Sequence, residues 1–428
     1  MRGEELGPLH GVPTAIKDLF DYKPGWPSTL GGIRALQHYV AHIACPFTER
    51  IERAGAIILG RTNSPTMGFR RTTDNDLFGP TRNPFDLRFN AGGSSGGAAA
   101  AVADGLVPFA EGTDGGGSIR IPAAWCGVYG YKPSAGRLPF VSRPNAFAGI
   151  SPFRHEGPIT RTLEDAALVL TALAGYHPLD PFALDERIDF LAATPAPSAA
   201  GASPTVRTFD IFPVEPEVQE AVGQAVRAFE EAGAIVEEVR IGMTRHQQEL
   251  SDLWCRLIMP ANHLALEHFR EQGFDLLGQH RHDFPPQYLE WLDRTGAMTA
   301  LDFSRAQCVR TEIYDVLQHL FAHYDLLVTP TLSCLPVENA NDGNTRGPRI
   351  VAGQPVDPLI GWCLTYPINF TGHPAASIPA GLSTSGLPIG MQRIGRRYAD
   401  ADVLAASAVF ERLRPWQPTY QRCATRPL

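Results

Sequence analysis

Short apolar segments alternate with amphipathic stretches along much of the chain. Residues 56–59 (AIIL) form an apolar run between two glycines, a pattern typical of a buried strand. Residues 216–232 place apolar side chains on one helical face, and the strand-like sequence AIVEEV follows at 234–239. Residues 325–328 (DLLV) again indicate a core strand. This alternation predicts an α/β fold in which helices cover both faces of a sheet.

Capping signals indicate two further helices. Residues 98–103 are rich in alanine, Ser95 can cap the start of this segment, and Gly105 can end it. Thr162 and Asp165 have the spacing of a capping box, and apolar residues on one helical face follow them. We therefore expect a helix to begin close to each of these two caps.

Irregular segments are expected to form loops. Residues 192–204 contain mainly Ala, Pro and Ser without periodicity, which predicts a surface excursion. Residues 336–358 are long and irregular, and together with residues 70–82 and 359–366 they are expected to line a substrate pocket. The pattern of apolar core segments is the same on either side of the excursion. Residues 1–428 are therefore expected to form a single large domain.

The composition argues against several classes of function. The 37 basic and 45 acidic residues give a net charge of −8, whereas nucleic-acid binding needs a basic face for the phosphates. No apolar run is long enough for a membrane span or a signal peptide, so no membrane partner is expected. The seven cysteines lack the spacing of metal or redox motifs, which predicts reduced cysteines in a cytoplasmic protein.

Lysine is rare, since only Lys17, Lys23 and Lys132 occur among the 37 basic residues. Lysine differs from arginine mainly because it can lose its proton when it is removed from water. Each lysine is thus a candidate for proton transfer. Alternatively, the rarity of lysine reflects only a general preference for arginine codons, and the three lysines then have no such role. Lys17 lies in the mostly apolar stretch GVPTAIKDLF, where desolvation is expected.

Residues 92–133 are rich in glycine and include two glycine-flanked serines, Ser94 and Ser118. A helical segment and an apolar strand-like segment separate the two serines, so both can return to the same end of a sheet. The backbone N–H groups of residues 115–117 have no side chains to shield them. Consecutive N–H groups of this kind can hold a developing oxyanion.

A serine hydroxyl is a poor nucleophile unless a base takes its proton. None of the 13 histidines lies within residues 92–133. A neutral lysine can act as the base instead, with Lys17 as the first candidate and Lys132, in YKPS, as its competitor. Asp114 and Arg120 flank the second serine and are expected to form an ion pair that braces the loop.

These motifs resemble those of the amidase signature hydrolases, and the resemblance extends from the first residues nearly to the end of the chain. It implies a single large α/β domain with a mixed central β-sheet covered by helices on both faces. The resemblance rests on five segments: GPLHGVPTAIKD at 7–18, the glycine-rich residues 92–133, GPITRTLEDAALVL at 157–170, NFTGHPAASIPAG at 369–381 and GLPIGMQRIG at 386–395.

The resemblance also implies a set of site residues and a reaction. It places the catalytic lysine at Lys17, a bridging serine preceded by a cis peptide at Ser94, and the acyl-forming serine at Ser118. A small-molecule amide would be hydrolysed to an acid and an amine or ammonia through a Ser118 acyl-enzyme, without a metal or a cofactor. A homodimer is compatible with this function. The implied oxyanion hole consists of the N–H groups of Gly115, Gly116, Gly117 and Ser118.

Other interpretations of the same residues stay open. Residues 92–96 match the G-x-S-x-G elbow of α/β-hydrolases, in which Ser94 would be the nucleophile, and the glycines can alternatively cradle a phosphate ahead of a helix. Within the resembled family, the amidotransferase A subunit hydrolyses glutamine in a tRNA-dependent complex. Gly115 occupies a position where this family usually has Thr, which favours a stand-alone amidase.

The chain has few residues before Lys17, whereas members of the resembled family usually carry a helical segment there. We therefore expect a shortened N-terminal helical segment and lower stability than in a full-length relative. A non-catalytic truncated relative is accordingly an alternative to an active amidase.

Overall fold

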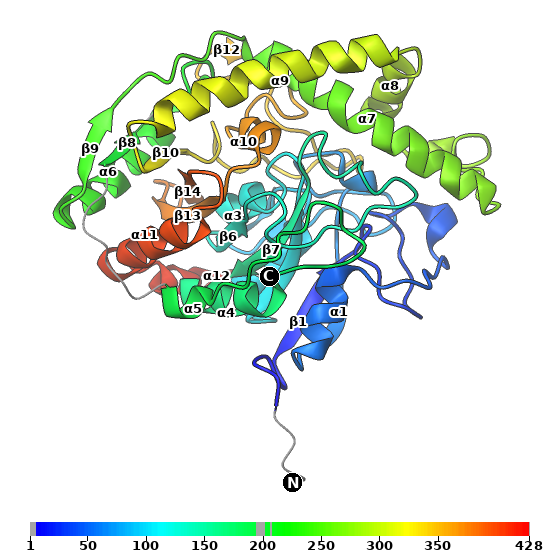
Figure 1. Ribbon diagram of the computed structural model, residues 1–428, viewed down its shortest axis with the longest axis horizontal. Coiled ribbons are helices and arrows are strands. Elements are labelled where there is room, and N and C mark those ends of the chain that lie inside the picture. The colour runs from blue at the N-terminus through cyan, green and yellow to red at the C-terminus, as the bar shows by residue number, and fades with distance from the viewer. Residues whose placement is uncertain (1–5, 194–201, 206–207, 428) are drawn as a thin grey trace.

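The computed structural model describes residues 6–193, 202–205 and 208–427, and it shows a twisted central sheet with helices packed around it (Figure 1). Within these residues the main sheet has eight strands. Their order across the sheet is β5 (Phe109–Asp114), β7 (His155–Thr160), β6 (Tyr129–Lys132), β13 (Ala375–Leu382), β14 (Pro388–Gly395), β10 (Leu326–Pro330), β8 (Ala202–Thr205) and β9 (Ile235–Glu238). The pairs from β5 to β10 are antiparallel, whereas β8 is parallel to both neighbours. The predicted α/β class with a mixed sheet is confirmed.

Helices cover both faces of this sheet. They include α2 (Gly96–Ala103), α3 (Arg120–Trp125), α4 (Leu163–Leu173), α6 (Pro216–Glu231) and α11 (Asp400–Leu413). On β14, Gly390 lies directly against Ala124 of α3. The guanidinium of Arg393 instead lies over the Phe229 ring of α6 and donates to the Ala406 carbonyl of α11. Because side chains at odd and even positions of a strand point to opposite faces, α3 lies on one face and α6 with α11 on the other.

Longer helices form a layer along one side of the molecule, at the top of Figure 1. They are α7 (Gln247–Glu271), α8 (Pro286–Thr295) and α9 (Ala300–Phe321), and α9 packs on both α7 and the short α10 (Tyr366–Thr371). The remaining elements are α1 (Pro46–Arg53), α5 (Phe190–Ala193), α12 (Gln421–Thr425), β1 (Pro13–Lys17), β2 (Ile57–Thr62), β3 (Arg82–Asn83), β4 (Asp86–Asn90), β11 (Ile350–Val351), β12 (Gln354–Pro355) and the 3₁₀ turns at Arg34–Leu36, Thr66–Gly68, Arg281–Asp283 and Gln417–Tyr420.

Most of the elements predicted from apolar periodicity are present. Helix α6 and strands β9 and β10 occupy the predicted segments, and Thr162 caps α4 by accepting from the Asp165 N–H. Residues 56–59 do begin a strand, β2, but its predicted burial is wrong. The side chains of Ile57 and Leu59 are 53% and 60% exposed, because β2 pairs with β1 in a separate two-stranded sheet outside the main one.

Two further expectations concern loops and membranes. Of the predicted excursion at 192–204, residues 194–201 lie outside the described residues, 192 and 193 end α5, and 202–204 belong to strand β8. Within the part of the chain that the structure describes, no helix combines the length and the apolar character that crossing a membrane requires.

The close contact between β14 and α3 yields a prediction about stability. A Cβ atom on Gly390 would lie 2.5 Å from the Ala124 Cβ and 2.8 Å from its Cα. Gly390→Ala should therefore destabilise the fold by about 1–3 kcal/mol, because the helix backbone must move away from the sheet. Gly223→Ala in α6 is the matched control, since nothing lies within 4 Å of the added Cβ. Urea denaturation of both variants measures the effect, and equal stabilities would contradict it.

Candidate active site

Lys17 is the last residue of β1 and its side chain is fully buried. Its Nζ lies 2.8 Å from the Ser94 Oγ and 2.7 Å from the Thr113 Oγ1. Burial lowers the pKa of Lys17 to about 8, and the nearby carboxyl groups of Asp21 and Glu111 oppose this shift. The lysine can therefore lose its proton close to neutral pH, as the sequence analysis expects.

Ser94 lies in the loop between β4 and α2, and the peptide bond between Gly93 and Ser94 is cis. This agrees with the cis peptide that the family resemblance implies. A side chain on Gly93 would lie 2.8 Å from the backbone carbon of Thr72, so the position requires glycine. The next residue, Ser95, stands at the start of α2 but does not cap it with its side chain. Its hydroxyl bonds to the backbone of Thr113 instead, which corrects the predicted capping role.

Ser118 lies between β5 and α3 and lines the same cavity as Ser94. The Ser95 N–H donates to the Ser118 carbonyl over 3.1 Å, and this bond joins the two serine loops. The Ser118 Oγ accepts a hydrogen bond of 2.7 Å from the Arg71 Nη1. Among the described residues, no hydrogen bond links the hydroxyls of Ser94 and Ser118 directly.

The glycine loop at 115–117 is held from several sides. The Gly117 N–H donates to the Asp114 Oδ1 over 2.7 Å, so this predicted oxyanion donor is occupied. Gly115, Gly116 and Ser118 have N–H groups for which the described part of the chain supplies no acceptor. These three groups are the donors still available to a bound oxygen atom.

The carbonyl groups of the glycine loop are fixed by two side chains from distant segments. The Trp254 Nε1 donates to the Gly115 carbonyl over 2.8 Å, and the Thr365 hydroxyl donates to the Gly116 carbonyl over 2.9 Å. Gly117 has a positive φ of 115°, and a Cβ there would lie 2.0 Å from the Thr365 Oγ1. Only glycine fits this position.

The predicted pair of Asp114 and Arg120 is confirmed as a fully buried ion pair, with 2.9 Å between Oδ1 and Nη2. Burial alone would raise the pKa of Asp114, but the Arg120 charge and its hydrogen bonds hold that pKa below its usual value. Arg120 also donates to the Thr365 carbonyl, to Asn369 and to Gln392. The pair thus anchors the glycine loop to α10 and β14.

Lys132, the competing lysine, lies elsewhere in the core. Its Nζ donates to the carbonyl groups of Pro133 and His373 and lies 3.5 Å from the His155 Nε2. Burial lowers the pKa of Lys132 as well, yet none of its hydrogen bonds within the described residues reaches Ser94 or Ser118. The fold brings Lys17, and not Lys132, to Ser94.

The cavity lined by Ser118 has a volume of about 90 Å³ in which the centre of a water molecule can lie. Its apolar wall consists of Leu19, Phe20, Met67, Phe69, Phe140, Val141, Trp254 and Ile258. Of the segments predicted to line it, 70–82 contributes Arg71, whereas no lining residue comes from 336–358 or 359–366. That part of the prediction is wrong, because loop length alone does not tell which way a loop folds.

Arg71 and Trp254 are the residues of this site that sequence analysis missed. The Arg71 side chain is buried, and its guanidinium lies 4.7 Å from the centre of the Trp254 ring. Burial lowers the pKa of Arg71 to about 10. Arginine is the usual basic residue in this chain, so nothing in the sequence distinguishes Arg71 from the others. Trp254 lies on α7, far from the glycine-rich motif, and carries no local signal either.

Two buried acidic residues, Asp21 and Glu111, lie close to Lys17. Burial raises the pKa of the Asp21 and Glu111 carboxyl groups, and the charge of Asp21 adds to the shift of Glu111. The Glu111 Oε2 accepts from the backbone N–H of Lys17 over 2.9 Å, so Glu111 helps to position the end of β1.

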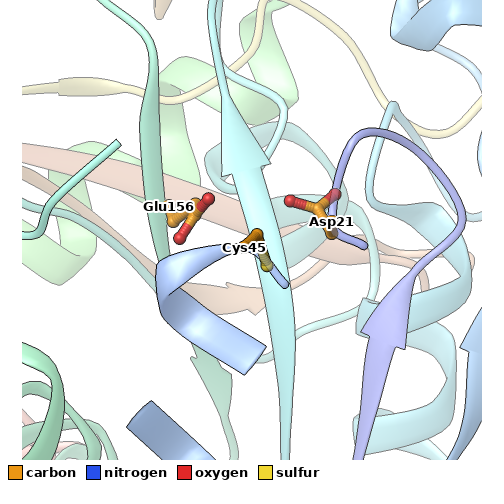
Figure 2. A group of neighbouring side chains, drawn as sticks. All are labelled: Asp21, Cys45 and Glu156. Atoms are coloured by element: carbon orange, nitrogen blue, oxygen red, sulfur yellow. The ribbon is translucent and has the colours of Figure 1, made fainter. Parts of the chain in front are cut away.

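Asp21, Cys45 and Glu156 form a cluster whose donor atoms lie within 4.8 Å of one another (Figure 2). Burial raises the pKa of the Cys45 thiol and of the Glu156 carboxyl. Cys45 accepts from the Thr48 N–H and Glu156 accepts from the Phe47 N–H, so both hold the start of α1. The cluster therefore has a structural role at this helix terminus.

The comparisons with known proteins agree with this geometry. A family model described as Amidase matches residues 1–404. An acylamidase of Rhodococcus erythropolis is 36% identical over 419 residues, covering 97% of this chain and 83% of that protein. The A subunit of the glutamyl-tRNA(Gln) amidotransferase of Moorella thermoacetica is 36% identical over 425 residues, covering 96% and 84%. A solved structure of a bacterial aryl acylamidase superposes with a TM-score of 0.98 at 51% identity, covering 100% of this chain and 87% of that one.

The chain is accordingly a hydrolase that acts on amide bonds. It belongs to the amidase signature family.

Replacing Lys17 by methionine should change how stability depends on pH. The pKa of this amine falls from 10.5 to about 8 on folding, so the unfolded chain binds more protons between these values and wild-type stability rises with pH. Methionine has no proton to lose. The unfolding free energy of Lys17→Met minus that of the wild type should therefore be about 1 kcal/mol smaller at pH 9 than at pH 7.

Urea denaturation at the two pH values measures this difference. Lys23→Met, which removes a partly exposed lysine paired with Glu52, is the matched control. A difference between Lys17→Met and wild type that does not change with pH would contradict the desolvation of Lys17.

Proposed function

We propose that this amidase works through a Ser118 acyl-enzyme, with Ser94 and Lys17 as the proton relay. The observation that carries the proposal is the buried contact of 2.8 Å between the Lys17 Nζ and the Ser94 Oγ, because Ser94 lines the same cavity as Ser118. A lysine with a pKa of about 8 can accept a proton close to physiological pH. No step of this mechanism uses a metal or a cofactor.

In the acylation step the Ser118 Oγ forms a bond to the carbonyl carbon of the amide. Its proton moves to the Ser94 Oγ, while the Ser94 proton moves to the neutral Lys17 Nζ. The electron pair of the carbonyl double bond moves to oxygen, and the free N–H groups of Gly115, Gly116 and Ser118 stabilise the oxyanion. The predicted donor Gly117 would contribute only if its bond to Asp114 opened.

Collapse of this intermediate breaks the carbon–nitrogen bond. The departing nitrogen takes the proton of Ser94, which recovers one from the Lys17 ammonium, so the same relay acts as base and then as acid. A water molecule next attacks the ester of Ser118, and its proton follows the same route to Lys17. Release of the carboxylic acid restores the Ser118 hydroxyl.

Arg71 holds Ser118 before substrate binds. Its Nη1 occupies one lone pair of the Ser118 Oγ, while its Nη2 donates to the carbonyl groups of Gly68 and Phe69. Catalytic hydrogen bonds are often loose in a free enzyme and tighten when substrate binds. In the proposed mechanism, the Ser118 hydroxyl hydrogen turns to Ser94 while the Arg71 contact maintains the orientation of the oxygen atom.

The proposed substrate is a small aryl amide. The cavity wall of Phe20, Phe69 and Trp254 suits a flat aromatic ring, because aromatic faces and edges pack well against one another. The similar solved structure at 51% identity is that of an aryl acylamidase, which supports the same class. A single catalytic domain of residues 1–428, a cytoplasmic location and a homodimer stay predictions.

An amidotransferase A subunit is the second candidate, because such subunits of several organisms are 31–36% identical to this chain. The glycine at position 115 and the aromatic cavity favour the free amidase. The two functions differ in what purified protein does alone. A free amidase hydrolyses simple amides without partners, whereas the amidotransferase component would act on glutamine in its complex.

Labelling with a serine-directed fluorophosphonate tests the proposed nucleophile. Intact mass should show one adduct on the wild type and none on Ser118→Ala. Lys17→Ala and Ser94→Ala should react at least about a hundredfold more slowly, because general base catalysis is lost. Lys23→Ala is the matched lysine control. An adduct that maps to Ser94 would replace this mechanism by that of an elbow hydrolase, and the absence of any adduct on folded protein would indicate a non-catalytic relative.

The pH dependence of the reaction tests the role of Lys17. Purified protein alone should hydrolyse 4-nitroacetanilide, with a kcat/KM that is constant above a pH of about 8 and falls about tenfold per pH unit below it. The sign follows because the base must be neutral to accept a proton. Release of 4-nitroaniline gives the rate. A flat profile between pH 6 and pH 9 would argue against a lysine base, and activity on glutamine only with added partner proteins would favour the amidotransferase.

A further inference from the structure

A second cavity adjoins the one above Ser118. It has a volume of about 150 Å³ in which the centre of a water molecule can lie. Its lining includes Tyr22, Tyr39, Ile43 and Phe269. The two cavities share five lining residues, which lie at the boundary between them and together are called the passage: Phe20, Phe140, Val141, Arg154 and Asn262. A substrate that fills the first cavity therefore extends towards this passage, where Arg154 is the charged residue among the five.

Arg154 lies immediately before β7, and not all of its N–H groups have a hydrogen-bond acceptor in the described part of the chain. The guanidinium lies 5.0 Å from the centre of the Phe140 ring, and its Nη2 has a long hydrogen bond of 3.4 Å to the Ser142 Oγ. The Nε is buried and has no acceptor within the described residues. Burial lowers the pKa of Arg154 to about 10, and no neighbouring acid counteracts this effect.

Arg71, the other arginine of the first cavity, makes more hydrogen bonds than Arg154. Arg71 donates to three oxygen atoms, one of them on Ser118. Asp21 and Glu156 also line the first cavity, and burial raises the pKa of each carboxyl group, which disfavours its charged form. Neither acid forms an ion pair with Arg154 in the described part of the chain. Arg154 thus keeps an uncompensated positive charge at the passage.

The second cavity contains one more arginine, Arg143, which provides a contrast. Its two terminal nitrogens donate to the carbonyl groups of Ser142 and Leu179, over 2.7 and 3.2 Å, and the side chain is exposed. A partly buried guanidinium gains more from an anionic partner than an exposed one, because water competes less for the hydrogen bonds. The geometry therefore favours Arg154 over Arg143 as the anion-binding group.

We propose that Arg154 binds a carboxylate carried by the substrate, on the part of the molecule that extends from the scissile amide into the passage. The substrate class is then an aryl amide with an anionic substituent, whose ring packs in the apolar first cavity. The stem of Arg154 supports this placement, because its Cγ would lie only 3.4 Å from a Cβ on Gly115 in the oxyanion loop. The inference rests on the proposed amidase mechanism and adds a specificity determinant to it.

Two matched pairs of substrates test the inference with the purified full chain. Acetanilide is compared with 4-acetamidobenzoate, which has a carboxylate on the amine side, and butyranilide with succinanilate, which has it on the acyl side. The wild type should prefer the carboxylated member of one pair by about tenfold in kcat/KM, as expected for a charge-assisted hydrogen bond. In Arg154→Gln this ratio should fall to about one, and Arg154→Lys should retain part of it.

Arg143→Gln is the matched control and should retain the wild-type ratio. Because each ratio compares two substrates on one variant, a general loss of activity cancels. Hydrolysis of the neutral anilides without any preference, or a preference that survives Arg154→Gln, would overturn the inference and leave the proposed amidase function intact.

Failure to hydrolyse any of the four compounds would count against the proposed function, so binding is measured as well. Calorimetric titration of Ser118→Ala with 4-aminobenzoate, succinanilate and aniline should show that one of the carboxylates binds more tightly than aniline. The added change Arg154→Gln should remove this difference. Equal affinities for all three probes would refute carboxylate binding at Arg154, whatever the activity.

Discussion

The removal of Lys17 from water is the physical constraint on which the site depends. An ammonium group in the protein interior is costly unless it is paired, and this cost makes the neutral amine accessible near neutral pH. Full neutralisation by Asp21 and Glu111 would cancel that effect. That neutralisation is weakened because burial raises the pKa of both carboxyl groups, which disfavours their charged forms. Lys17 is left with two hydroxyl partners, on Ser94 and Thr113, that accept or donate in either protonation state.

Close packing fixes Ser118, the proposed nucleophile, relative to this lysine. The loop that contains Ser118 runs from β5 into α3, and α3 lies against the sheet where Gly130 and Gly390 leave room for Ala123 and Ala124. Trp254 and Thr365 hold the carbonyl groups of the loop from the other side. The loop therefore has little freedom, and oriented N–H groups of this kind need no reorganisation when charge develops.

The sequence was informative where a local pattern has one structural solution. Apolar periodicity located α6, β9 and β10, and the glycine-rich motif with an isolated lysine located the serines and Lys17. Local patterns do not report what covers a strand, which is why the exposure of Ile57 and Leu59 was missed. They also do not reveal which of many arginines turns inward. Arg71 reaches Ser118 only through the three-dimensional path of its loop.

The hydrogen bonds of Arg120 connect the loop that contains Ser118 to residues that follow much later in the chain. Its partners Thr365, Asn369 and Gln392 are 245 to 272 positions away in sequence. Contacts between such distant segments form late in folding, because a long loop must first be closed. During synthesis on the ribosome, the segments with Lys17, Ser94 and Ser118 emerge well before these partners. The loop that contains Ser118 therefore gains these contacts only after the chain has been made as far as Gln392.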